Sequence, residues 1–287
     1  MTWLDAVETV AGVLGESLPG QHARAEAWRF TTRLAGMSSF FLPAGAADRI
    51  PPPLSRSMAL AIHRLASGEP EAYVLGKVPF HEVEVEVNPG TLIPRPETEV
   101  LVNTAIESCK DAGLAEPYIL ELGTGSGCIS LALAHAIPQA RITATDIWPP
   151  ALDTAARNLS SVMRAGRVRL VRADWLAWTS AQWDLIVSNP PYIAATAIPG
   201  LPPSVREWEP HVALDGGPDG FSHLGEIIAH APRHLNPQGF LILEISPEQA
   251  GRAVECALTH GFQSAEIVED YAGRSRVMRG AMAGCEQ

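Results

Sequence analysis

The chain is poor in several features that mark common classes of protein. It has two lysines among its 21 basic residues, and its formal net charge is −11. A protein that binds nucleic acid through the phosphates normally presents a basic surface. The charge balance therefore argues against nucleic acid as the main partner.

Long apolar runs and cysteine pairs are also missing. No stretch of 18 apolar residues occurs, and the first twenty residues carry acids rather than a basic segment. The sequence therefore predicts neither a membrane-spanning helix nor a secretory signal. The four cysteines stand far apart without a Cys-x-x-Cys pair, which argues against a disulfide framework or a zinc site. We expect a cytoplasmic protein without a metal ion.

The first quarter of the chain has a helical pattern. With 287 residues, 46% of them hydrophobic, the chain is long enough to bury a large core. In residues 54–65 the apolar side chains recur at helical spacing, after prolines 51–53 and before Gly68. Weaker helical patterns cover 7–18 and 23–36.

Residues 82–93 predict a small hairpin. Three valines between 83 and 87 alternate with three glutamates, which is the period of a half-exposed strand. Asn88–Gly90 is a turn signal, and 91–93 is predicted to return as the second strand. We expect this hairpin to link two domains.

From residue 94 onward, apolar runs alternate with helical segments. This alternation predicts a mostly parallel sheet covered on both faces, an α/β fold. The predicted strands are 118–122, 141–146, 168–171, 184–187 and 240–245, and the clearest predicted helices are 129–135, 151–159 and 224–234. Two strand-like runs within 265–281, with no helix between them, predict an antiparallel pair that closes the sheet.

A glycine-rich loop follows the first predicted strand. Gly123, Gly125 and Gly127 would allow close approach of a ligand, and the next helix would offer free amides. The spacing is G-x-G-x-G, whereas the dinucleotide fingerprint needs glycine where Cys128 stands. A structural turn is the plain alternative.

Side chains at the next two strand ends are suited to a nucleoside. Asp146 lies about 20 residues past the loop, where an acid accepts from ribose hydroxyls. Asp174 could accept from an adenine amino group, and the Trp175 indole could pack on the ring. A helix N-cap and a core tryptophan are the structural alternatives for Asp146 and Trp175.

The fourth predicted strand ends in a stiff corner, Ser188-Asn189-Pro190-Pro191-Tyr192. Two prolines fix φ and donate no hydrogen bond, which leaves backbone carbonyls without competing amides. Asn189 offers an acceptor and a donor, and Tyr192 offers a flat face and a hydroxyl. The corner predicts a site for a planar NH₂ group, whose hydrogens the Asn189 side chain and the Pro190 carbonyl accept.

Together these motifs carry a family resemblance. The segments "ELGTGSG" and "SNPPY", with Asp146, resemble a class I methyltransferase that uses S-adenosylmethionine on an amide or exocyclic amine. The segments "GEPEAYVLGKVPF", "TLIPRPETEVLV" and "WEPHVALDGGPDG" resemble the protein-(glutamine-N5) methyltransferases of the HemK/PrmC family, from about residue 68 to 245.

The resemblance implies a fold and an activity. We expect a Rossmann-like seven-stranded methyltransferase domain at 94–287, an N-terminal helical substrate-recognition domain at 1–72 and a linking hairpin at 73–93. The implied reaction is transfer of a methyl group from S-adenosylmethionine, without a metal, to the side-chain N5 of the Gly-Gly-Gln glutamine in class I peptide chain release factors.

The resemblance also implies site residues. The cofactor residues are expected to be Gly123, Thr124, Gly125, Ser126, Gly127, Asp146, Trp175 and Asn189. The catalytic residues are expected to be Asn189, Pro190 and Tyr192, with Pro191 as a further substrate contact. Arg95, Pro96 and Glu97 are expected to border the methionine end of the cofactor.

Some features depart from the family and leave alternatives open. The loop "TGSGCI" is closer to enzymes that methylate a ribosomal-protein glutamine, and the N-terminal helices are poor in lysine. Adenine-N6 methylation of nucleic acid and a non-catalytic S-adenosylmethionine-binding protein also stay open; a dehydrogenase fits least. His223, His230 and His234 are predicted to form a solvated helix face rather than a metal site, and residues 215–220 a tight loop.

Overall fold

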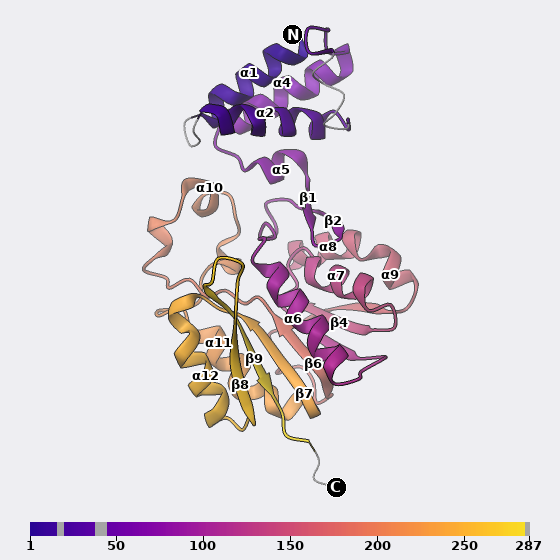
Figure 1. The fold of residues 1–287 in the computed structure, drawn as a ribbon, viewed down its shortest axis with the longest axis vertical. Coiled ribbons are helices and arrows are strands. Elements are labelled where there is room, and N and C mark those ends of the chain that lie inside the picture. The colour runs from indigo at the N-terminus through magenta and orange to yellow at the C-terminus, as the bar shows by residue number, and fades with distance from the viewer. Residues whose placement is uncertain (16–19, 38–44, 285–287) are drawn as a thin grey trace. The chain divides into compact units, whose positions relative to one another are not determined.

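The computed structural model describes residues 1–15, 20–37 and 45–284. The chain divides into two compact units: Met1–Lys77 with Pro203–Trp208, and Val78–Pro202 with Glu209–Gln287 (Figure 1). The expected division at residues 72 and 93 stays a prediction. The sequence analysis did not predict that a later segment, Pro203–Trp208, belongs to the first unit.

The first unit is helical. Its helices are α1 (Trp3–Leu14), α2 (Gly20–Leu34), α4 (Pro52–Ala66), α5 (Glu71–Leu75) and α10 (Pro203–Arg206). The three predicted helices correspond to α1, α2 and α4, although the predicted end of the first, residues 16–18, lies outside the described residues. Apolar side chains of α1, α2 and α4 form its core: Val7, Val10, Ala27, Phe30, Ala61 and Leu65.

The hairpin is present, but its second strand was predicted on the wrong side. Strand β2 (Val83–Glu86) pairs with β1 (Lys77–Phe80), which precedes it. Residues 91–93 form no strand, because their backbone bonds elsewhere. The Thr91 amide donates to the Asn88 carbonyl, and the Ile93 amide donates to the Glu209 carboxylate at 3.0 Å.

The second unit contains a seven-stranded sheet in the order β5-β4-β3-β6-β7-β9-β8. The first five of these strands are parallel, and β9 is antiparallel to both of its neighbours. The strands are β3 (Tyr118–Leu122), β4 (Arg141–Asp146), β5 (Val168–Arg172), β6 (Trp183–Ser188), β7 (Leu235–Glu244), β8 (Ser264–Glu269) and β9 (Ser275–Ala281). The predicted strands and the antiparallel closing pair are confirmed, although β7 runs over Leu235–Glu244 and not over the predicted 240–245.

Helices cover both faces of this sheet (Figure 1). One set is α6 (Thr98–Asp111), α7 (Cys128–Ala136), α8 (Pro149–Asn158) and α9 (Ser160–Arg164); the other is α11 (Ser222–His230) and α12 (Ala250–Thr259). The three predicted helices correspond to α7, α8 and α11. The prediction over 224–234 ran too far, because α11 gives way at Ala231–His234 to a 3₁₀ turn that contains Pro232.

Alternation along the strands builds the core on both faces. Leu120 and Leu122 of β3 face the α11–α12 side, where they pack with Ile227 and Ala253. Because successive side chains point to opposite faces, Glu121 between them points to the α7 side. Within the described residues, no helix is both long and apolar enough to cross a membrane.

Candidate active site

A pocket of about 210 Å³ lies where the parallel strands end. Because β3, β4, β5 and β6 are parallel, their carboxyl ends share one edge, and open α/β sheets bind ligands at this edge. The segments after all four of these strands contribute to its wall. Its polar lining includes Thr91, Arg95, Thr98, Thr124, Ser126, Asp146, Asp174, Asn189 and His223.

The glycine loop forms one wall of the pocket. Gly123, Gly125 and Gly127 have φ angles of 67°, 55° and 82°, in the left-handed region that favours glycine. A Cβ on Gly127 would lie 3.1 Å from Leu159 Cδ1, whereas a Cβ on Gly125 would meet nothing within 4 Å. The loop is therefore packed on its helix side and open at Gly125, which lines the pocket.

Asp146 joins the loop to the second strand. Its carboxylate accepts from the Gly125 amide at 2.9 Å and from the Trp148 amide at 2.8 Å. Burial raises the pKa of Asp146, and these backbone hydrogen bonds oppose that shift. A carboxylate has about four lone-pair sites, so Asp146 can still accept from ligand hydroxyls.

Trp175 and His223 form the aromatic part of the wall. Their ring centroids lie 5.2 Å apart, and Trp175 has a φ of 38°. A Cβ on Gly123 would lie 3.6 Å from the Trp175 ring, an ordinary van der Waals contact, so the indole lies directly against the loop. His223 is half-buried and lines the pocket, which corrects its prediction as part of a solvated face, whereas His230 is exposed.

The Asn-Pro-Pro-Tyr corner faces the pocket with Asn189 and Pro191. The Asn189 Nδ2 donates to the Thr98 hydroxyl at 3.2 Å. The Tyr192 hydroxyl turns toward the sheet and donates to Glu244 Oε1 at 3.1 Å. Burial and the negative charge of Glu244 raise the pKa of Tyr192 far above its ordinary value, so it stays a neutral donor.

The loop predicted at 215–220 packs against the Asn-Pro-Pro-Tyr corner and is hydrogen-bonded to the chain next to it. The Gly216 amide donates to the Ile193 carbonyl at 2.8 Å, and Gln249 Nε2 donates to the carbonyls of Tyr192 and Gly220. Cβ atoms on Gly216 and Gly220 would lie 2.8 Å from Tyr192 Cα and 2.5 Å from the Tyr192 carbonyl oxygen. Only glycine lets the loop pack this closely on the corner.

Arg95 is held at the pocket by a buried acid. Glu209, whose side chain is 1% exposed, forms an ion pair with Arg95 and accepts from the Ile93 amide. Glu209 thus bonds to residues 93–95, which lie more than 110 positions earlier in the sequence. Arg95 lines the pocket, whereas Pro96 and Glu97, predicted beside it, are not among its lining residues.

Comparison with known proteins identifies the family. A family model described as the methyltransferase small domain matches residues 98–199. The chain is 42% identical over 219 residues to the release factor glutamine methyltransferase of Moorella thermoacetica, which covers 75% of this chain and 76% of that protein. It is 40% identical over 234 residues to the release factor glutamine methyltransferase of Cereibacter sphaeroides, and this match covers 80% of this chain and 81% of that protein. The chain belongs to the release factor glutamine methyltransferase family.

Solved structures agree with this fold. A methyltransferase from Pyrococcus furiosus has a TM-score of 0.51 and 20% identity, over 70% of this chain and 88% of that one. At this identity the likeness shows the fold alone. The predicted fold class, an α/β class I methyltransferase with a seven-stranded sheet, is confirmed.

The pocket of this methyltransferase brings together most of the residues that the sequence singled out. Gly123, Thr124, Gly125, Ser126, Asp146, Trp175, Asn189 and Pro191 line it. Gly127, Pro190 and Tyr192 are not among its lining residues, and Pro190 is buried. Their expected roles stay predictions. Among the described residues, no group of three or more histidine, cysteine or acidic side chains is placed to hold a metal ion.

Glu121 was missed by the sequence analysis. It is fully buried in β3, and its Oε2 accepts from the hydroxyls of Thr124 and Ser130. Burial raises its pKa to about 7, and the two hydroxyls oppose the shift. Thr124 belongs to the glycine loop and Ser130 to α7, so the two hydrogen bonds to Glu121 connect the loop with α7. The available signal was an acid inside an otherwise apolar strand, "ILEL".

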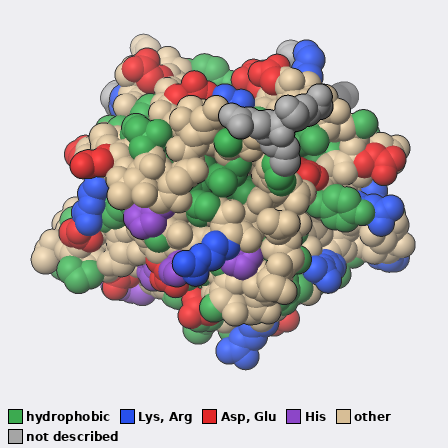
Figure 2. Space-filling model, turned by 90° about the horizontal axis from the view of Figure 1, so that it is seen from below, with side chains coloured by type: hydrophobic (Ala, Val, Ile, Leu, Met, Phe, Trp, Pro, Cys, Tyr) green, Lys and Arg blue, Asp and Glu red, His purple; other side chains and the backbone are tan. Residues whose placement is uncertain are grey.

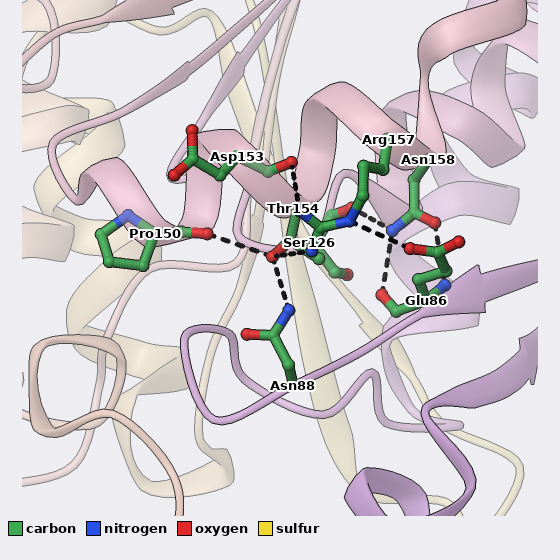
Figure 3. A network of polar contacts seen from close by, with 8 residues as sticks. All are labelled: Glu86, Asn88, Ser126, Pro150, Asp153, Thr154, Arg157 and Asn158. Carbon is green, nitrogen blue, oxygen red and sulfur yellow. Dashed lines mark hydrogen bonds and ion pairs between the residues drawn. The ribbon is translucent and has the colours of Figure 1, made fainter.

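A polar network ties the hairpin to the glycine loop (Figure 3). Asn158 Nδ2 donates to the carbonyls of Ser126 and Glu86 at 2.8 and 2.9 Å, and Asn158 Oδ1 accepts from the Glu86 amide at 2.8 Å. Nearby, Asn88 Nδ2 donates to the Thr154 hydroxyl at 2.8 Å. Helix α8 therefore holds the segment at residues 88–92 and the loop together as two walls of one pocket.

We expect Asn158→Ala to destabilise the second unit. The change removes one partly buried hydrogen bond, to Ser126, and two exposed ones, to Glu86. We expect a loss of roughly 1–3 kcal/mol in the free energy of unfolding, with weaker cofactor binding. Urea unfolding measures the loss. Arg157→Ala is the comparison, because it removes an exposed ion pair with Glu86, worth at most about 1 kcal/mol, and a hydrogen bond to the Thr154 hydroxyl, but no bond to the glycine loop. Equal losses in both variants would contradict a special role for Asn158.

Proposed function

We propose that this chain transfers a methyl group from S-adenosylmethionine to the side-chain N5 of the glutamine in the Gly-Gly-Gln motif of class I peptide chain release factors. The observation that carries the proposal is the position of Asn189, which lines the same pocket as the glycine loop, Asp146 and Trp175. A rigid amide is thereby held beside a nucleoside-type site. The relatives named above carry this activity in their names.

The residues present fit the cofactor. Gly125 is open toward the pocket, Asp146 keeps lone pairs for ribose hydroxyls, and Trp175 offers an indole for the adenine ring. Asp146 ends β4 and Trp175 follows the neighbouring strand β5, so the two groups lie on one edge of the sheet. Arg95 is a candidate for the carboxylate at the methionine end. Bound there, S-adenosylmethionine supplies a methyl group on a positively charged sulfur.

The protein's part in the reaction is to hold a poor nucleophile. An amide nitrogen shares its lone pair with the carbonyl, so it attacks only when well oriented. Asn189 Oδ1, which faces the pocket, accepts one of the two amide hydrogens. That the Pro190 carbonyl accepts the other and that the Tyr192 ring packs on the amide plane stay predictions, because neither residue is among those that line the pocket. Orientation of this kind can contribute roughly 7–11 kcal/mol to lowering a barrier. After transfer, the methylated nitrogen is acidic and loses its proton to solvent without a strong base.

Charge favours a protein over a nucleic acid as the partner. The net charge is −11, and on the face drawn in Figure 2 the visible acidic and basic side chains are interspersed rather than gathered into one basic patch. Nucleic acid binding through phosphates favours the opposite pattern. We therefore propose release factors rather than nucleic acid as the partner.

A methylation assay tests the function. The purified protein is incubated with labelled S-adenosylmethionine and, in separate tubes, a class I release factor, ribosomal proteins or a DNA oligonucleotide. We expect one added methyl group on the Gly-Gly-Gln glutamine, located by mass spectrometry. A methyl group on a ribosomal protein or on adenine instead would keep the site and overturn the partner.

We expect Asp146→Ala to weaken cofactor binding by about 10- to 100-fold, because it removes a charged acceptor and the hydrogen bond that holds the Gly125 amide of the loop, together with the bond to the Trp148 amide. Calorimetric titration with S-adenosylhomocysteine measures the change. Asp153→Asn is the control: it removes the same charge from neighbouring α8, at an exposed side chain outside the pocket. Affinity that stays normal in Asp146→Ala would remove Asp146 from the cofactor site.

A further inference from the structure

Two segments that line the pocket belong neither to the sheet nor to the long helices of the second unit. Residues 90–95 form no helix or strand, and residues 210–213 contain a single 3₁₀ turn, His211–Ala213. Residues 90–92, 94 and 95 of the first segment line the pocket, as do residues 210, 212 and 213 of the second. Walls without a regular framework depend on other contacts to stay in place.

The segment at 210–213 lies at the rim of the pocket. Val212 lines the pocket and is also 45% exposed. A backbone hydrogen bond from the Ala213 amide to the Pro210 carbonyl stays within the segment. Just beyond it, the Leu214 carbonyl accepts from the Ile193 amide at 3.2 Å. The far end of the segment is therefore fixed to the chain that follows the Asn-Pro-Pro-Tyr corner.

Glu209 fixes the near end of the same segment. Its side chain is 1% exposed, and each carboxylate oxygen has its own partner at residues 93–95. Oε1 accepts from the Arg95 guanidinium, and Oε2 accepts from the Ile93 amide at 3.0 Å. We call these two bonds the Glu209 clasp. Because Glu209 directly precedes residues 210–213, the clasp ties the two wall segments to each other.

Separating the two segments breaks the clasp. A ligand in the pocket lies against residues of both segments, so its release at this rim requires them to part. Parting leaves the Glu209 carboxylate without its donors and Arg95 without its acid. Breaking a buried ion pair in this way costs more than breaking an exposed one. The clasp therefore adds to the barrier that opposes opening.

We propose that Glu209 is a positioning residue that holds segments 90–95 and 210–213 together at the rim of the pocket, so that opening of its clasp sets the rate at which the cofactor is released. The proposal rests on the proposed function for the identity of that cofactor. It makes no use of the protein substrate, so it can be tested with the cofactor product alone.

Glu209→Gln is the main test, because glutamine keeps the shape but has one side-chain oxygen instead of two. Its NH₂ group would face a donor, either the Arg95 guanidinium or the Ile93 amide. We expect S-adenosylhomocysteine to dissociate at least tenfold faster, as measured by stopped-flow tryptophan fluorescence. We expect single-turnover methyl transfer at saturating S-adenosylmethionine to stay within threefold of the parental rate, because the Asn-Pro-Pro-Tyr corner is not changed.

The matched control is a second buried acid that pairs with an arginine. Glu69 is 8% exposed, and its two oxygens accept from Nε and Nη2 of Arg64. It belongs to the first unit and is not among the residues that line the pocket. Glu69→Gln therefore removes the same kind of contact elsewhere, and we expect parental dissociation of S-adenosylhomocysteine. Equal increases in both variants, or a parental rate in Glu209→Gln, would overturn the proposal.

A second ligand separates the clasp from a direct contact between Arg95 and the cofactor. 5′-Methylthioadenosine lacks the amino-acid part of S-adenosylhomocysteine, so it offers no carboxylate to Arg95. We expect Glu209→Gln to accelerate its dissociation by the same factor within threefold. Faster dissociation of S-adenosylhomocysteine alone would mean that Glu209 only orients Arg95 toward the carboxylate, and the clasp would be refuted.

The double variant Arg95→Met/Glu209→Gln covers the case in which an unpaired arginine unfolds the single variant. It removes both charges together, and we expect 5′-methylthioadenosine to dissociate from it at least tenfold faster than from the parental protein. A parental rate in a folded double variant contradicts the clasp. If the rates agree with these expectations but no release factor is methylated, the proposed function fails and the clasp stands.

Discussion

Asn189→Ala is expected to lower kcat on a release factor by about 100- to 1,000-fold, the range found when one positioned polar group is removed from an active site. The physical reason is that the alanine variant lacks the Asn189 Oδ1 acceptor, which holds one of the two substrate amide hydrogens. The Pro190 carbonyl alone then leaves the amide free to rotate. We expect the Kd for S-adenosylhomocysteine to change only a few-fold, because Asp146, Trp175 and the loop are intact.

The control for this prediction is Asn236→Ala. Asn236 also makes a partly buried side-chain bond, donating to Asp184 at 2.7 Å, but it lies at the start of β7, at the opposite edge of the sheet. We expect its kcat to equal that of the parental protein. Single-turnover kinetics at saturating cofactor separates the chemical step from binding. Near-normal turnover in Asn189→Ala, with unchanged cofactor affinity, would show that the corner does not hold the reacting amide.

The strands of the second unit could be read directly from the sequence. Tyr118–Leu122 and Arg141–Asp146 were predicted with the bounds that the structure shows, because short apolar runs between turn residues leave little choice. Helix α6 was not named, and its packing explains why. Residues on most sides of α6 are buried, so the helix lacks the one-sided apolar pattern that marks an exposed helix.

The hairpin error has a different cause. The true partner strand, Lys77–Phe80, contains Pro79, and a proline within a run argues against a strand. In a two-stranded sheet each strand has an edge without a partner, where the missing amide costs nothing. The sequence analysis did not name the segment that pairs and chose the segment at 91–93, whose amides bond to Asn88 and Glu209.

Some residues of the candidate site belong to short sequence motifs, and others contact the site from distant positions in the sequence. The glycine loop, Asp146 and the Asn-Pro-Pro-Tyr corner are short motifs, each visible within a few residues. Glu209 and Thr98 are not, because they act on Arg95 and Asn189 across 114 and 91 positions of sequence. A single sequence carries no record of such contacts. These two supporting contacts therefore had to come from the structure.

Gly220→Ala is the second change for which we expect a large effect. Gly220 has a φ of 76°, and a Cβ there would lie 2.5 Å from the Tyr192 carbonyl oxygen and 3.0 Å from the Ala194 nitrogen. Both neighbours are backbone atoms, so the corner itself must shift. We expect a loss of roughly 2–5 kcal/mol in the free energy of unfolding, from the left-handed conformation and the overpacking together.

Gly273→Ala separates these two contributions. Gly273 has nearly the same φ, 74°, but a Cβ there would meet nothing within 4 Å. Its alanine variant therefore carries only the conformational cost, about 1–2 kcal/mol, and we expect its kcat to be unchanged. Urea unfolding of both variants gives the difference that belongs to the contact with Tyr192.

The activity of Gly220→Ala then shows what the loop is for. A misplacement of about 1 Å at a catalytic group can cost roughly 100-fold in rate, so we expect a fall in kcat of at least tenfold at a temperature where the variant is fully folded. The Kd for S-adenosylhomocysteine should stay close to parental, because Gly220 is not among the residues that line the pocket. If Gly220→Ala loses no more stability than Gly273→Ala and keeps its kcat, the loop at 215–220 does not support the corner. A selective loss of kcat would show that the loop at 215–220, which lies outside the pocket lining, holds the backbone of the Asn-Pro-Pro-Tyr corner in the position that the reaction needs.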